Sequence, residues 1–147
     1  MRAFLAALIV LLLARPAAGA GEEHYSCEVE SFYRFANAEF VRNDKSELIG
    51  ERFSVDRTSG VISGFELSNL QAQERLVIDR GSKKQAFKVL SVFEVYGPYQ
   101  GVKYLHIEEF RQTPQKAFFA VSGSWLLTGH CTGGGEPDKD GTGEAIQ

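Results

Sequence analysis

Two cysteines and three histidines are the side chains of this sequence best suited to redox or metal chemistry. Cys27 and Cys131 stand near the two ends of the region expected to fold, without the Cys-x-x-Cys spacing of redox enzymes. Their separation favours a structural disulfide that closes a loop of about 100 residues. His24, His106 and His130 form neither a His-x-His nor an HExxH pattern, so no metal site is expected.

No pattern of residues indicates nucleophilic or paired-carboxylate catalysis. Residues 60–64 (GVISG) and 122–125 (SGSW) come nearest to the Gly-x-Ser-x-Gly elbow of serine hydrolases, and neither has its spacing. Glu108 and Glu109 are adjacent, but neighbouring side chains of a strand point to opposite faces, so the two carboxylates cannot act as a pair. The sequence therefore predicts no catalytic residue and no cofactor.

Aromatic side chains, 12% of the residues, are the compositional feature that points to a function. Strands and cores favour aromatic residues, so many of these rings are expected inside the fold. An interior or an exposed patch rich in rings would instead bind an apolar ligand or a partner. The residues that we select as candidate ligand-binding residues are Tyr104, His106, Phe118 and Trp125.

Adjacent aromatic residues constrain how such a site is built. In the pairs Phe32-Tyr33 and Phe118-Phe119, both rings cannot face one core if the residues lie on a strand. At least one ring of each pair must therefore face a second layer, a partner or water.

Short β-prone runs separated by turn residues are the elements that must position these side chains. The expected runs are 26–35, 53–55, 61–67, 76–78, 86–96, 102–110, 117–121 and 124–131. This spacing predicts an all-β fold, an antiparallel meander of about seven or eight strands that forms a small barrel or a sandwich. Residues 37–49, followed by Gly50, suggest one short helix.

The first run alternates between two faces. Cys27, Val29, Ser31, Tyr33 and Phe35 are expected on one face, and Glu28, Glu30, Phe32 and Arg34 on the other. If the cysteines join neighbouring first and last strands, His130 lies opposite Glu28. That arrangement predicts a surface His–Glu pair that stabilises the fold by a few tenths of a kcal/mol.

The N-terminus has the pattern of a secretory signal peptide. Arg2, the apolar run 3–14 and the small residues 17–20 predict residues 1–20 as a segment cleaved after Ala20. The apolar run is too short to span the ~30 Å hydrocarbon core, so no membrane span is expected after cleavage. Residues 21–131 are expected to form one domain, and 132–147 a disordered polar tail.

The net charge and the absence of a glycosylation sequon limit the classes of partner and the cellular compartments to consider. The net charge of -3 becomes more negative without Arg2 and Arg15, so nothing indicates the concentrated basic surface that nucleic acids require, and no nucleic-acid partner is expected. The absence of an Asn-x-Ser/Thr sequon favours the bacterial periplasm over an extracellular destination.

Three classes of function remain open. The first is an exported non-catalytic domain that binds a small apolar ligand or an envelope protein. The second is an enzyme whose acid–base groups converge from scattered strands, namely His106, Glu108, Asp56 and Asp79. The third is a structural or assembly role in which the Gly-rich tail or a free strand edge makes the contact.

Overall fold

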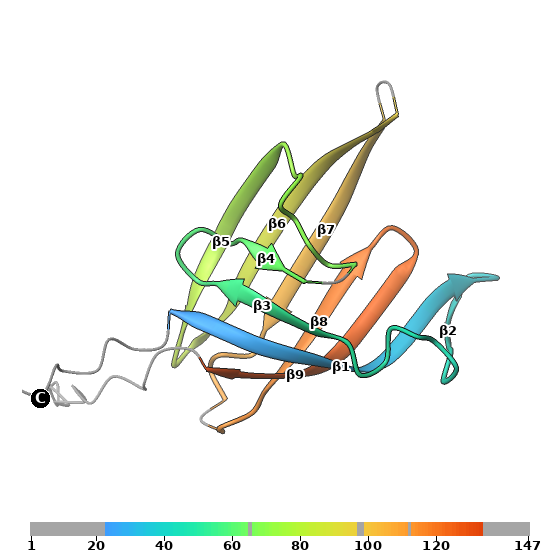
Figure 1. The fold of residues 1–147 in the computed structure, drawn as a ribbon. Helices are drawn as coiled ribbons and strands as arrows, with labels where there is room; N and C mark the ends of the chain where they lie inside the picture. Colours follow the sequence, from blue (N-terminus) through green and yellow to red (C-terminus); the bar gives the residue numbers. More distant parts are fainter. Residues whose placement is uncertain (1–22, 65, 97–98, 112, 134–147) are drawn as a thin grey trace, which may run out of the picture.

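The computed structural model describes residues 23–64, 66–96, 99–111 and 113–133 (Figure 1). This part of the chain contains β-strands and no helix, which confirms the all-β prediction. The strands are β1 (His24–Ala36), β2 (Glu39–Arg42), β3 (Arg52–Asp56), β4 (Ile62–Ser63), β5 (Glu74–Ser82), β6 (Gln85–Tyr96), β7 (Tyr99–Ile107), β8 (Lys116–Ser122) and β9 (Trp125–Gly133).

The strands form one antiparallel sheet that curls into a half-barrel. Their order is β4-β3-β1-β9-β8-β7-β6-β5, and β2 pairs with β1 outside this path. The consecutive strands β5 to β9 form the predicted meander, and β1 returns to lie between β9 and β3. In Figure 1, β3 and β4 cross in front of β6 and β7, so they cover the concave side of the half-barrel.

The core fills this concave side. Its side chains come from both the meander and the strands that cover it, and Phe53, Val55 and Ile62 meet Phe87 and Leu105 there. On β6, Phe87 and Val89 are buried while Lys88 and Leu90 are partly exposed, as the alternation of a strand requires. The apolar side chains on one face of the meander are therefore buried inside the fold.

The Cys27–Cys131 disulfide is confirmed, and it joins β1 to β9 where the two cysteines are register partners. The same register places Glu28 opposite His130, as predicted. The ion pair itself differs, because His130 Nδ1 lies 2.7 Å from Glu30 Oε1. Glu28 instead accepts a hydrogen bond of 2.8 Å from Arg52 Nε on β3.

A β-bulge explains this change of partner. The register between β1 and β9 shifts between Val29 and Ser31, which makes Glu30 an extra residue. Beyond the bulge the faces exchange: Phe32 is buried, and Tyr33 lies on the outer face with Leu126 as its partner. The predicted alternation is therefore correct as far as Val29 and wrong from Ser31 onward.

The short helix suggested for residues 37–49 is wrong. Asn37 and Ala38 both have positive φ angles, 52° and 66°, and connect β1 directly to β2 as a two-residue hairpin turn. Residues 43–50 form turns that end where Gly50 N donates to Val29 O at 2.8 Å. Residues 39–42 pair in antiparallel register with β1, so they are extended and not helical.

The ends of the domain differ from the expectation in one respect. Thr132 and Gly133, expected in the tail, belong to β9 and pair with Ser26 and Tyr25 of β1. The expected signal peptide, residues 1–20, and the rest of the tail, residues 134–147, lie outside the described residues. Among the described residues, no helix is long and apolar enough to cross a membrane.

Candidate binding face

The four candidate ligand-binding residues lie on opposite faces of the sheet. Phe118 is buried on the concave side, where its ring meets Phe53 edge-on with centroids 5.2 Å apart. Trp125 is on the same side and packs against Phe32 at 5.8 Å. Tyr104 and His106 lie on the convex face, so the four side chains do not form one site.

Tyr104 and His106 belong to an aromatic group on the convex face that also includes Phe119. His106 stacks on Phe119, its register partner on β8, with centroids 4.7 Å apart and planes inclined by 19°. Tyr104 Oη lies 3.3 Å from His106 Nδ1, and its ring is 5.9 Å from that of Phe119. The prediction that one ring of each adjacent pair turns away from the core is confirmed by Phe119 and Tyr33.

The environment of His106 keeps its ring neutral at pH 7. Partial burial lowers the pKa of His106, the positive charge of Lys88 lowers it further, and Glu108 opposes them weakly. A neutral imidazole accepts a hydrogen bond at one nitrogen and presents an apolar face to Phe119. The group therefore behaves as a surface of rings at neutral pH.

An apolar row crosses the convex face through this group. Strand pairing aligns six side chains, one on each of six neighbouring strands, as successive register partners: Leu76, Leu90, Tyr104, Val121, Leu126 and Tyr33. Beside the row lie Phe119 on β8 and the register pair Val92–Val102 on β6 and β7. Leu76 is 52% exposed and Val102 47%.

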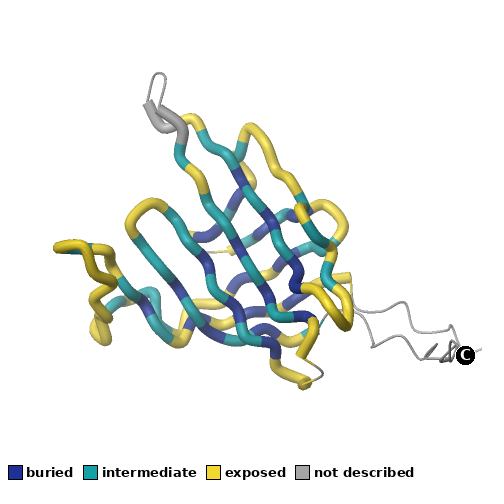
Figure 2. Tube along the Cα trace, turned by 180° about the vertical axis from the view of Figure 1, so that it is seen from behind, coloured by how far each residue is buried: buried dark blue, intermediate teal, exposed yellow. Residues whose placement is uncertain are grey.

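None of the described segments covers this face. Figure 2, seen from behind the view of Figure 1, turns the convex side of β5 to β9 toward the reader and shows many partly exposed positions along the strands. An antiparallel sheet that faces water usually carries polar side chains on that face. The apolar row departs from this rule, and it is the feature that most needs a functional explanation.

Several polar and charged side chains around the row are paired with one another. Lys88 Nζ lies 3.9 Å from Asp79 Oδ2, and Arg111 forms an ion pair with Glu108. His130 Nδ1 lies 2.7 Å from Glu30 Oε1. The Lys88–Asp79 and Arg111–Glu108 pairs therefore each bring opposite charges together at the border of the convex face.

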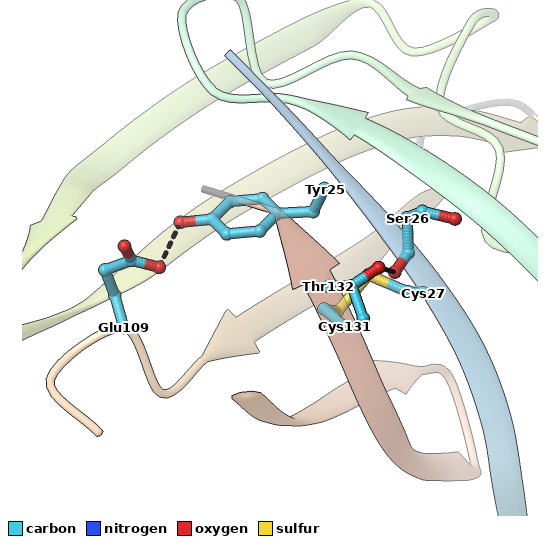
Figure 3. The surroundings of a disulfide bond; sticks show 6 residues. All are labelled: Tyr25, Ser26, Cys27, Glu109, Cys131 and Thr132. Atoms are coloured by element: carbon cyan, nitrogen blue, oxygen red, sulfur yellow. Dashed lines mark hydrogen bonds between the residues drawn. A yellow bond between two sulfur atoms is a disulfide. The ribbon is translucent and has the colours of Figure 1, made fainter. Parts of the chain in front are cut away.

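A buried cluster of charged side chains lies at one end of the concave side, whereas the convex face carries the apolar row. Figure 3 shows Tyr25, beside the disulfide, donating to Glu109 at 2.8 Å. Lys116 Nζ lies 3.8 Å from Glu109, and Arg57 lies 3.9 Å from it and 5.4 Å from the Tyr25 ring. Burial and the bond to Glu109 raise the pKa of Tyr25, so its hydroxyl stays protonated and keeps donating.

This cluster has a structural explanation. Arg57 Nη2 also donates to Arg80 O at 3.1 Å, so the β3–β4 turn is tied to β5. Gly81 leaves just enough space, because a Cβ there would lie 3.0 Å from Glu109 Cβ. The cluster thus fastens the two open ends of the half-barrel to each other.

The proposed acid–base groups do not converge in one pocket. His106, Glu108 and Asp79 lie on the convex face, where Lys88 pairs with Asp79. Asp56 is the last residue of β3, where hydrogen bonds from Ser59 lower its pKa. Among the described residues, no group of three or more His, Cys, Asp or Glu side chains could hold a metal ion.

An open hollow lies beside the convex face. It has a volume of about 500 Å³ and is lined by Arg111, Thr113, Pro114, Gln115, Ala117 and His130. Two of its lining side chains already have partners: Arg111 forms an ion pair with Glu108, and His130 Nδ1 lies 2.7 Å from Glu30 Oε1. The hollow therefore adds an open, uneven surface at the border of the convex face.

Sequence reasoning missed most of the apolar row. Leu76, Leu90, Val121 and Leu126 are common strand residues, and only the pairing of six strands brings them into line. The sequence signal that pointed to this face was the pair Phe118-Phe119. No protein-family model, no curated protein and no solved structure matches this chain.

Proposed function

We propose that this protein is an exported, non-catalytic β-domain that binds a partner protein through its convex face. The observation that carries the proposal is the apolar row that runs in register across six strands. Contiguous exposed apolar patches of this kind mark interaction sites in soluble proteins, because leaving them in water costs free energy that a partner recovers.

The shape of the face favours a protein over a small ligand. Small-molecule sites are concave and enclose most of the ligand surface. The concave side of this half-barrel is filled by core side chains such as Phe87, Leu105 and Phe118. A partner protein can cover an outward-curved face, whereas a small molecule placed on it keeps most of its own surface in water. An envelope protein is the partner class that suits an exported domain.

Export is supported by two independent features. Residues 1–20 have the pattern of a cleaved signal peptide. The Cys27–Cys131 disulfide suits an oxidising compartment, where such bonds persist. The lack of a glycosylation sequon favours the periplasm within that group of compartments.

Site-specific photo-crosslinking in the exporting cell tests the proposal. A benzophenone amino acid replaces Phe119 on the convex face in one variant, and Thr58, exposed in the β3–β4 turn, in a matched control. We expect a discrete adduct of higher mass from position 119 and none from position 58. Equal adducts at both positions, or no adduct at position 119, would contradict binding at the convex face.

A further inference from the structure

The Cys27–Cys131 disulfide lies in the middle of a row of buried register partners. Phe53 on β3 is the partner of Cys27, and Lys116 on β8 is the partner of Cys131. Cys27 and Cys131 are 1% and 0% exposed, and the flanking Phe53 and Lys116 are 3% and 9% exposed. A second molecule therefore cannot reach either cysteine while the fold is closed.

The chemistry of disulfides requires such access. A disulfide forms or breaks when a thiolate attacks a sulfur of another disulfide, which first gives a mixed disulfide. The attacking sulfur approaches from the side opposite the sulfur that leaves. An exchange partner must therefore come from the side of β3 to reach Cys27, or from the side of β8 to reach Cys131. One of these two strands has to move before the bond can be made or broken.

Of the two strands, β3 can leave with less disruption of the sheet. β8 continues into β9 through residues 123–124 and lies inside the meander, between β7 and β9. β3 is separated from β1 along the chain by β2 and residues 43–51, and it ends the sheet together with the short edge strand β4. Residues 52–63, which we call the covering segment, can therefore open while the meander stays paired.

The covering segment is held in place by two anchors. Asn69 is fully buried, and its Oδ1 accepts a hydrogen bond of 2.7 Å from Ile62 N. Its Nδ2 donates to Gly60 O and to Ser91 Oγ of β6, both at 2.8 Å. At the β3–β4 turn, Arg57 Nη2 donates to a backbone carbonyl of β5 at 3.1 Å. Substitutions of these two anchoring side chains should release the segment without changing the row that contains the disulfide.

We infer that the disulfide is made while the covering segment is still open, by an oxidant that itself carries a disulfide. The thiolate of one cysteine attacks the oxidant and expels one of its two thiols. The thiolate of the other cysteine attacks the resulting mixed disulfide and expels the second thiol. The two cysteines thus lose two electrons and two protons, which the oxidant gains as its two thiols.

This inference gives the protein a place in a reaction sequence. The chain is the substrate of a thiol oxidase before the covering segment closes over the concave side, and the closed fold then protects the finished bond. The inference does not depend on what binds the convex face.

Reduction of the folded protein tests the inference, because exchange in the two directions passes through the same open state. Purified oxidised protein is treated with dithiothreitol, quenched with acid and alkylated, and the free thiols are counted by mass spectrometry. We expect reduction to be at least about 100-fold slower than in the same chain unfolded in urea. Asn69→Ala should speed up the reduction about tenfold or more, because it frees the covering segment.

Trp125→Ala is the matched control. Its ring packs on Phe32 at the end of the β1–β9 pair far from the disulfide, so its loss destabilises the fold without releasing the covering segment. We expect it to change the rate less than about threefold, even if urea unfolding shows a loss of stability like that of Asn69→Ala. Arg57→Gln, which removes the second anchor, takes the place of Asn69→Ala if that variant does not fold.

Two results would overturn the inference. Wild-type protein that is reduced as fast as the unfolded chain would show that the cysteines are accessible in the closed fold. Rates that follow the loss of global stability in the releasing variant and in Trp125→Ala alike would show that the whole fold has to unfold before exchange, and not the covering segment alone.

Discussion

The two faces of the β5–β9 meander carry similar apolar side chains, but one face is buried in the core and the other is exposed. Phe118 is 3% exposed and packs against Phe53 in the core, whereas its neighbour Phe119 stacks on His106 at the surface. The concave face is covered by β3 and β4, and no described segment covers the convex face. Composition is therefore a poor guide to role in this sheet, because coverage decides whether an apolar side chain stabilises the fold or is available for binding.

The charged residues repeat this contrast. Glu109 is buried between Arg57, Lys116 and the hydroxyl of Tyr25. His130 and Glu30 meet at the outer surface, where their side chains are 42% and 55% exposed. Breaking the first group leaves charges without solvent, and breaking the second does not.

The sharpest test of the contrast is a matched pair of ring deletions. Phe118→Ala should lower the free energy of unfolding by about 3–5 kcal/mol, because it leaves a cavity in the core. Phe119→Ala should lower it by about 1 kcal/mol or less, because that ring is partly in water. Urea unfolding of both variants measures the difference. Equal losses would mean that the two faces contribute alike to stability.

Removing the disulfide tests how far the concave side depends on the link between β1 and β9. The bond joins residues 104 positions apart, and its loss frees the unfolded chain. The double substitution Cys27→Ala and Cys131→Ala should lower the free energy of unfolding by about 2–4 kcal/mol. Denaturant unfolding beside the oxidised wild type checks this value. A variant as stable as the wild type would show that strand pairing alone closes the fold.

The buried charged cluster provides a third comparison. Glu109→Gln removes the only carboxylate described between Arg57 and Lys116, and it should cost about 2–3 kcal/mol of unfolding free energy. Glu28→Gln breaks the exposed pair with Arg52 and should cost less than about 1 kcal/mol. Thermal unfolding of both variants compares them. A larger loss from Glu28→Gln than from Glu109→Gln would contradict this expectation.

The smallest effect is expected from the titration of His106 on the convex face. Its pKa in the folded protein is lower than its ordinary value of 6.5, mainly through partial burial, so protonation favours the unfolded chain. The stabilisation is complete above about pH 6.5 and is lost as the pH falls through the lowered pKa. Unfolding free energies between about pH 7.5 and 5 should therefore fall more steeply for the wild type than for His106→Gln. Parallel curves would contradict this dependence.

Local patterns predicted the parts of the fold that depend on single strands and turns. Alternation and turn residues indicated the meander, and the placement of Cys27 and Cys131 indicated the disulfide. The bulge at Glu30 was not predictable, because an extra residue in a strand depends on the partner strand and on the turn that Gly50 and Glu51 bring beside Val29. The hairpin turn was missed because Asn37-Ala38 lacks the glycine typical of such turns.

The candidate site was predicted only in part for the same reason. Tyr104 and His106 were selected as aromatic strand residues, and both lie on the convex face. Strand register aligns Leu90, Val121 and Leu126 into the apolar row, and a single sequence does not determine this register.

The most direct test of convex-face binding is the crosslinking yield of a chain whose apolar row is made polar. Leu90→Thr, Val121→Thr and Leu126→Thr are combined with the benzophenone residue at position 119. Threonine keeps strand propensity, and circular dichroism with an unchanged melting transition verifies the fold. We predict that the adduct falls about tenfold or more, since several apolar contacts are lost together. An undiminished adduct from the folded triple variant would contradict the account, because the row would then contribute nothing to binding.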